Sequence, residues 1–138
     1  MNVHFSSAKD NWETPTDFFE KLNQEFHFTL DVAADEKNHK CKRYFTKEID
    51  GLAQSWAGEI VWCNPPYGRI YPPKFVRKLA DGSAKIAVAL LPARTDTRWF
   101  HDHILGKAEI RFLRGRIKFV GAKHGAPFPS MICIWRKA

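Results

Sequence analysis

Residues 84–93, AKIAVALLPA, are apolar almost throughout, and this run constrains the fold more than any other part of the chain. A strand of this composition is typical of a parallel sheet that is covered on both faces. Two further runs, FTLDVAA at 28–34 and EIVWCN at 59–64, also predict buried strands, the first ending near Asp31. Because helix signals alternate with these strands, we expect an open α/β sheet that is parallel at its centre.

The first helix signal lies at the ETP segment, where Thr14 can cap a helix, Pro15 suits its first position and Asp17 favours the helix dipole. Its apolar side chains fall on one broad face: Phe18, Phe19, Leu22 and Phe26. Further elements are predicted as a short strand at 43–46, a short helix at 50–56, a helix over 73–82 that Pro73 starts, and a helix over 95–106 with Thr95 or Asp96 as cap.

The C-terminal part predicts an antiparallel edge to the sheet. Residues 108–122, AEIRFLRGRIKFVGA, indicate two strands around Arg114 and Gly115, and residues 130–137 indicate a last strand. Arg116 and Lys118 alternate with apolar residues in the second of these strands. Such a basic ridge fits either the wet face of a strand pair or a surface that contacts DNA phosphates.

Length and composition favour a single domain over residues 1–138, with residues 1–10 flexible. No apolar run approaches the ~20 residues of a membrane span, and the N-terminus lacks a signal-peptide core, so we expect a cytoplasmic protein. The three cysteines predict buried, reduced thiols, and no ligand spacing predicts a metal site. The net charge of +7 fits a polyanionic partner or plain solubility.

Two expected strand ends carry unusual residues, Asp31 and the stretch that begins at Asn64. Ligands of open α/β sheets bind outside the carboxyl ends of strands. Pro65 and Pro66 have no N–H donors, so this loop offers mainly carbonyl oxygens and the Asn64 amide. A rigid set of acceptors beside an exposed aromatic ring, Tyr67, suits a planar group that bears an NH₂.

At NPPY the sequence resembles the S-adenosylmethionine-dependent amino-methyltransferases, which methylate the exocyclic amine of adenine or cytosine. The whole chain is similar to the small phage and prophage DNA N-6-adenine-methyltransferases. The matching motifs are WETP at 12–15, LDVAA at 30–34, RYFT at 43–46 with DGL at 50–52, NPPYGR at 64–69, LLPARTDTRWFH at 90–101, IRFLRGRIKF at 110–119 and APFPSMI at 126–132.

The resemblance implies a compact, truncated Rossmann-like methyltransferase sheet and site-specific methylation of adenine N6 in double-stranded DNA, in the cytoplasm of a phage or prophage host. It implies that a flipped-out base is held by the catalytic residues Asn64, Pro65, Pro66 and Tyr67. It implies S-adenosylmethionine contacts from Trp12, Thr14, Pro15, Asp31, Ala33, Asp50 and Leu52. Nucleic-acid contacts are expected from Arg69, Arg94, Arg114, Arg116 and Lys118.

The chain departs from the family pattern after the first strand, where DVAADEKN contains no glycine. No acid clearly matches the position that holds the cofactor ribose, for which Asp35 and Glu48 are the candidates. We expect no separate target-recognition domain, so specificity must come from loops. Asp50 fits either a cofactor contact or a helix cap. Two alternative functions are open. One is methylation of cytosine N4, RNA or a glutamine side chain, and the other is that of a DNA-binding module that has lost its cofactor.

Overall fold

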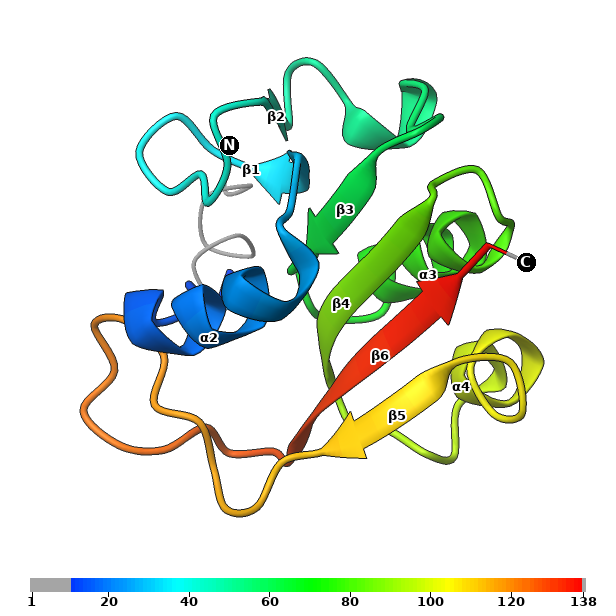
Figure 1. Cartoon of the computed structure of the whole chain (residues 1–138). Helices are drawn as coiled ribbons and strands as arrows, with labels where there is room; N and C mark the ends of the chain where they lie inside the picture. Colours follow the sequence, from blue (N-terminus) through cyan, green and yellow to red (C-terminus); the bar gives the residue numbers. More distant parts are fainter. Residues whose placement is uncertain (1–10, 138) are drawn as a thin grey trace.

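The computed structural model describes residues 11–137, and the segment 1–10, which we expected to be flexible, lies outside them. The described chain forms a six-stranded sheet in the order β2-β1-β3-β4-β6-β5 (Figure 1). Its strands are β1 (Leu30–Ala34), β2 (Tyr44–Thr46), β3 (Ile60–Cys63), β4 (Ile86–Pro92), β5 (Glu109–Phe112) and β6 (Ser130–Arg136). The helices are α2 (Thr16–Phe26), the 3-10 turn η1 (Gly51–Ala53), α3 (Tyr71–Ala80) and α4 (Arg98–His103).

The four strands β2, β1, β3 and β4 are parallel to one another. Strand β6 runs antiparallel to β4 over its full length, from the pair Ile86 and Arg136 to the pair Pro92 and Ser130. Strand β5 pairs antiparallel with β6 at the sheet edge. The predicted parallel centre and antiparallel edge are therefore confirmed.

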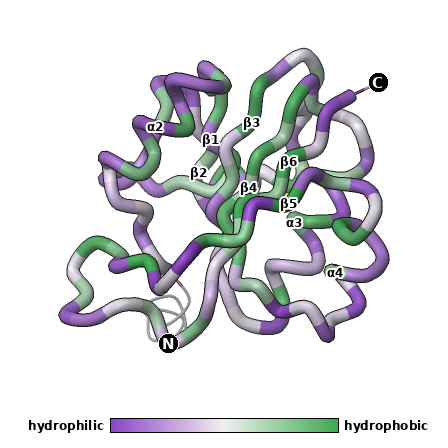
Figure 2. The backbone as a smooth tube through the Cα atoms, turned by 60° about the horizontal axis from the view of Figure 1, so that its bottom comes forward, coloured by the Kyte–Doolittle hydropathy of each residue, from purple (hydrophilic) through white to green (hydrophobic). Residues whose placement is uncertain are grey.

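Successive side chains of the central strands point to opposite faces of the sheet and enter two separate cores. Val61 and Cys63 of β3 face α3 and α4, whereas Trp62 between them faces α2. The second core is completed by the aromatic residues of the loop before β6, including Phe119. Figure 2 shows the hydrophobic segments gathered along β3, β4 and β6. Burial on both faces explains why these strands read as nearly continuous apolar runs.

The helix starts differ from those that we predicted. Helix α2 begins at Thr16 with Pro15 as its N-cap residue, and no side chain caps it. Helix α4 is capped by Thr97, whose hydroxyl accepts a hydrogen bond from the Phe100 N–H at 3.2 Å, so the predicted caps at 95 and 96 are wrong. Helix α3 starts at Tyr71 and not at Pro73. Its first turn tolerates prolines, because the N–H groups that they lack would have no partner within the helix.

The predicted strand pair within 108–122 is wrong beyond β5. Strand β5 ends at Phe112 and pairs with β6, and residues 113–129 form a long irregular connection. The connection closes on itself where Ala126 N–H donates to the Ile117 carbonyl at 2.9 Å. It also reaches the N-terminal segment, since Val120 N–H donates to the Glu13 carbonyl at 3.0 Å. Aromatic burial, and not strand pairing, holds this basic segment.

All three cysteines are free and buried, as predicted. Cys63 ends β3, Cys133 lies in β6 and Cys41 lies in the loop before β2. Burial raises the pKa of the Cys41 and Cys133 thiols to about 12. These thiols are therefore protonated packing groups at neutral pH. Within residues 11–137, no helix combines the length and the apolarity that a membrane crossing requires.

Candidate active site

The sheet reverses its direction of growth at β1, because the chain places β2 on one side of this strand and β3 on the other. The crevice at such a switch point is where open α/β sheets bind ligands. Strand β1 contributes Asp31 and Ala33 here, and β3 leads directly into Asn64. The prediction that the strand ends near Asp31 is wrong, because β1 continues to Ala34. Asp31 consequently lies inside the sheet and not on an open loop.

Asn64 is held by the segment that precedes α2. Its Nδ2 donates to the Trp12 carbonyl and, at 3.0 Å, to the Thr14 hydroxyl. A carbonyl can only accept, so this pairing fixes which end of the amide faces Trp12. The Oδ1 atom of Asn64 then points away from these partners and is buried without a hydrogen bond in the described structure. A buried acceptor without a partner is costly and indicates a site for a donor.

Thr14 is 1% exposed, and its hydroxyl serves Asn64 instead of the end of α2. We had predicted that Thr14 caps α2. It does not, because its hydroxyl is engaged with Asn64. Trp12 packs edge-on against Phe128 and in a tilted arrangement against Phe119. The WETP segment therefore braces the Asn64 amide through one backbone carbonyl and one hydroxyl. Asp17 lies in the first turn of α2, as predicted.

Tyr67 is buried, and the prediction that its ring is exposed is wrong. The ring is 4% accessible and meets Phe119 and Phe128 edge-on. Its hydroxyl donates to the Leu90 carbonyl of β4 at 2.9 Å. Pro65 is also buried, and Pro66 is half-buried. The buried ring and its hydrogen bond to β4 therefore anchor the loop to the sheet.

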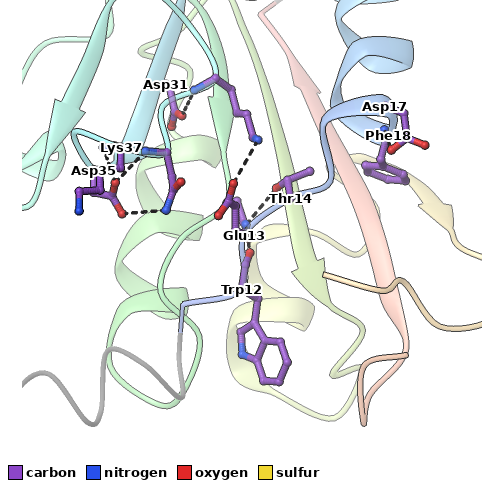
Figure 3. A network of polar contacts seen from close by, with 11 residues as sticks. Trp12, Glu13, Thr14, Asp17, Phe18, Asp31, Asp35 and Lys37 are labelled. Carbon is purple, nitrogen blue, oxygen red and sulfur yellow. Dashed lines mark hydrogen bonds and ion pairs between the residues drawn. The ribbon is translucent and has the colours of Figure 1, made fainter. Parts of the chain in front are cut away.

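Asp31 is a buried acid with two backbone donors. Its carboxylate accepts from Lys40 N–H at 2.9 Å and from Ala33 N–H at 3.2 Å. Burial raises the pKa of this carboxyl to about 6, against the lowering effect of those two donors. The side chain of Lys40 reaches Glu13, with 3.9 Å between Nζ and Oε2 (Figure 3). The loop after β1 is thus tied to both Asp31 and the segment before α2.

The raised pKa predicts how stability depends on pH. The folded protein holds the Asp31 proton where the unfolded chain has already released it, so stability falls as pH rises from about 4 to about 7. The difference is on the order of 3 kcal/mol, since the pKa rises from 3.8 to about 6 and each pKa unit is worth about 1.4 kcal/mol. Urea unfolding of the wild type and of Asp31→Asn at a series of pH values measures it.

The difference between the two unfolding curves isolates Asp31, because Glu59 and other surface acids contribute with the opposite sign. The Arg43 guanidinium and the Thr29 hydroxyl hold the pKa of Glu59 below its usual value against its partial burial. Lys40 and His39 are the basic neighbours of Asp31, and they are unchanged in the variant. Parallel pH profiles for the two proteins would contradict a buried, protonated Asp31.

Asp50 acts as a cap for η1, one of the two interpretations that its position left open. Its carboxylate accepts from Leu52 N–H at 3.2 Å, and its backbone adopts a left-handed conformation at φ 63°. The turn is fixed further by Trp56, whose indole N–H donates to the Gly51 carbonyl at 2.9 Å. Lys78 of α3 donates to the Leu52 carbonyl at 2.8 Å. Asp50 itself is exposed, so its carboxylate keeps room for another donor.

Gly51 is a site residue that the sequence did not single out beyond its place in the DGL motif. A Cβ atom on this residue would lie 2.2 Å from the Val32 carbonyl oxygen. The turn that carries Asp50 and Leu52 therefore lies directly against β1. A glycine after an acid indicates only a turn, so nothing in the sequence shows which strand approaches it.

The predicted basic contacts separate into two groups. Arg69 and Arg94 line one cavity of about 400 Å³ beside the carboxyl ends of β3 and β4. Arg114, Arg116 and Lys118 lie in the irregular connection 113–129. Arg116 donates to the Ala126 carbonyl at 3.2 Å and holds that connection closed. The three residues do not form the alternating ridge of a strand pair.

The two acids considered for the cofactor ribose lie elsewhere. Asp35 accepts from Lys37 N–H and Asn38 N–H, both at 2.8 Å, and so shapes the loop after β1. Glu48 is exposed in the turn after β2. Among residues 11–137, no three His, Cys, Asp or Glu side chains are grouped closely enough to hold a metal ion.

The mixed six-stranded sheet and the Asn-Pro-Pro-Tyr loop at its switch point define an α/β protein of the methyltransferase-like class. A sequence model described as DNA N-6-adenine-methyltransferase (Dam) matches residues 3–138, so the chain belongs to this family. The resemblance stated from the motifs is thereby confirmed. The description of the family names a methyltransferase of DNA adenine.

Two relatives are similar to the chain. The DNA N-6-adenine-methyltransferase of Escherichia phage T1 is 34% identical over 109 residues, which cover 75% of this chain and 44% of the phage protein. A protein of Escherichia coli (strain K12) named "Putative methyltransferase YfdM" is 37% identical over 65 residues, 42% of this chain and 71% of its own length. The chain thus matches less than half of the length of the phage enzyme.

Proposed function

We propose that this protein transfers a methyl group to the exocyclic N6 amine of adenine at specific sites in double-stranded DNA. The observation that carries the proposal is the unpaired, buried Oδ1 of Asn64, held in a fixed orientation at the switch point of the sheet. The family membership and the printed name of the phage T1 relative support the same substrate. Such a protein works in the cytoplasm of the bacterial host, where the DNA of a phage or prophage is found.

Asn64 acts as an acceptor for the target amine. With Nδ2 engaged by Trp12 and Thr14, Oδ1 remains available to take one amine hydrogen. The Pro65 carbonyl takes the second hydrogen in our proposal. Two acceptors draw the amine toward a tetrahedral geometry and return its lone pair from the ring to nitrogen. Preorganised acceptors of this kind need no reorganisation when the reaction occurs.

The adenine must leave the DNA stack before its amine can reach Asn64, so base flipping is part of the proposal. Because Tyr67 is buried against Phe119 and Phe128, we assign it the task of fixing the loop and not of stacking on the base. Its hydrogen bond to the Leu90 carbonyl fixes the proline-containing loop to β4. Positioning by a rigid loop is itself a large contribution to rate.

We propose S-adenosylmethionine as the methyl donor, which supplies an electrophilic methyl group when bound. The residues at the switch point fit such a group because they combine a buried acid, small side chains and a close-packed turn. Asp31 and Ala33 would hold it from β1, and Asp50 with Leu52 would hold it from η1. Trp12, Thr14 and Pro15 would close the crevice from the side of α2. The exposed Asp50 carboxylate suits an amine donor such as that of an adenine ring.

The test is methylation of mixed DNA with a labelled methyl donor, followed by mass spectrometry of the nucleosides. N6-methyladenine is the expected product. N4-methylcytosine, or label in RNA or in protein glutamine, would replace the proposed substrate by one of the alternatives. DNA binding without any methylated product or donor binding would show that the chain is a binding module with the same fold.

A further inference from the structure

A basic groove runs beside the proposed site, between α3 and α4. One cavity of about 400 Å³ is lined by Arg69 and Arg94, and a second of about 220 Å³ is lined by Lys74, Arg77 and Arg98. Pro73 and Trp99 line both cavities, so the two are adjacent. The groove lies beside the carboxyl ends of β3 and β4, whereas the switch point of the sheet lies at β1 and β3.

The cations of this groove are not used by the fold. All five side chains are exposed, and within residues 11–137 none of them forms an ion pair or a hydrogen bond. The arginines that do stabilise the fold are paired, as Arg111 is with Glu25 and Glu109. Asp102 is the acidic residue of the groove lining. An unpaired positive charge of this density indicates an anionic partner.

The chemistry of the groove fits a nucleic-acid backbone. Pro73 and Trp99 supply apolar lining, and the cations supply positive charge. Deoxyribose rings alternate with phosphates along a DNA strand, so a lining of both kinds matches the strand. Arg94 lies directly after β4, and Arg69 lies directly after the NPPY loop and Gly68. A strand in the groove would therefore begin next to the flipped base.

We propose that the groove between α3 and α4 binds the phosphodiester backbone of the DNA strand that carries the target adenine. The proposal rests on the proposed function, and it assigns binding roles to Lys74, Arg77 and Arg98 besides the two arginines named earlier. The connection 113–129 is then not the main phosphate contact. Phosphate contacts fix the register of the strand and carry no sequence information.

The experiment measures DNA affinity against salt concentration for the wild type and for the double variant Arg77→Gln/Arg98→Gln. Each lost phosphate contact should lower the slope of log K against log salt by about 0.9 on duplex DNA, so the pair should lower it by about 1.8. The loss should be equal on two unrelated sequences. Lys85→Gln is the matched control, because Lys85 is exposed immediately before β4, at the opposite end of the sheet.

An unchanged slope in the double variant overturns the proposal, and a reduced slope in Arg114→Gln/Lys118→Gln would then place the backbone on the connection 113–129. A loss confined to one sequence also overturns it, because it would indicate base reading. Failure of the proposed function is distinguished by the product assay. If the wild type yields no N6-methyladenine but the groove variants lower the slope, the groove binds DNA and the proposed reaction is wrong.

Discussion

Replacing Asn64 by alanine should lower methyl-transfer turnover at least ~10²-fold, the scale of one lost preorganised polar contact in a transition state. The variant removes the unpaired Oδ1 and, with it, one of the two proposed acceptors for the target amine. Affinity for S-adenosylmethionine should change far less than turnover, because Asn64 makes none of the proposed donor contacts, which come from β1, η1 and the segment 12–15. Single-turnover methylation measures the first quantity, and calorimetric titration of the donor measures the second.

The variant Thr14→Val separates two contributions to turnover. One is the hydrogen bond that Asn64 Oδ1 accepts from the target amine, and the other is the orientation of the Asn64 amide by its neighbours. Valine has nearly the shape of threonine but removes the hydroxyl that takes the Nδ2 hydrogen at 3.0 Å. The Trp12 carbonyl still orients the amide in this variant, so the loss of turnover should be several times smaller than in Asn64→Ala. Wild-type turnover in Asn64→Ala would remove Asn64 from the catalytic site. An equal loss in both variants would show that the bracing alone limits the rate.

The strands and their parallel centre could be predicted because burial on both faces leaves a clear mark in the sequence. The run at 84–93 is apolar for a simple reason: alternate side chains of β4 enter two different cores. The predicted strand pair within 108–122 was wrong for a related reason. Its alternating basic and apolar residues satisfy the period of a strand, but Phe119 is buried against Trp12 and Tyr67. Tertiary packing overrode a local pattern.

The position of the site could also be predicted from strand ends, whereas the contacts within it could not. Asn64 follows β3 as expected, but the tether from Trp12 joins residues 52 positions apart. Tyr67 looked exposed because a proline-rich loop normally lies on the surface. Its burial depends on Phe119 and Phe128, which the sequence places far away. Contacts of this kind arise from the topology and leave no periodic signal.

Gly51→Ala should be the most destabilising single substitution in the turn that carries Asp50. The added Cβ would lie 2.2 Å from the Val32 carbonyl oxygen, and no flexible side chain is available to give way. The turn cannot shift freely, because the Gly51 carbonyl accepts the Trp56 indole N–H at 2.9 Å in the core. We expect a loss of about 3 kcal/mol in the free energy of unfolding, the upper part of the range for overpacking.

Gly106→Ala is the matched control, since it adds the same methyl group under the opposite conditions. Gly106 has φ 77°, and a Cβ atom there would meet nothing within 4 Å. Only backbone strain acts at this position, which costs roughly 1–2 kcal/mol for a left-handed residue. Urea unfolding of both variants measures the difference. If Gly51→Ala costs no more than Gly106→Ala, then η1 can move away from β1, and the close approach does not hold Asp50 and Leu52 beside the crevice.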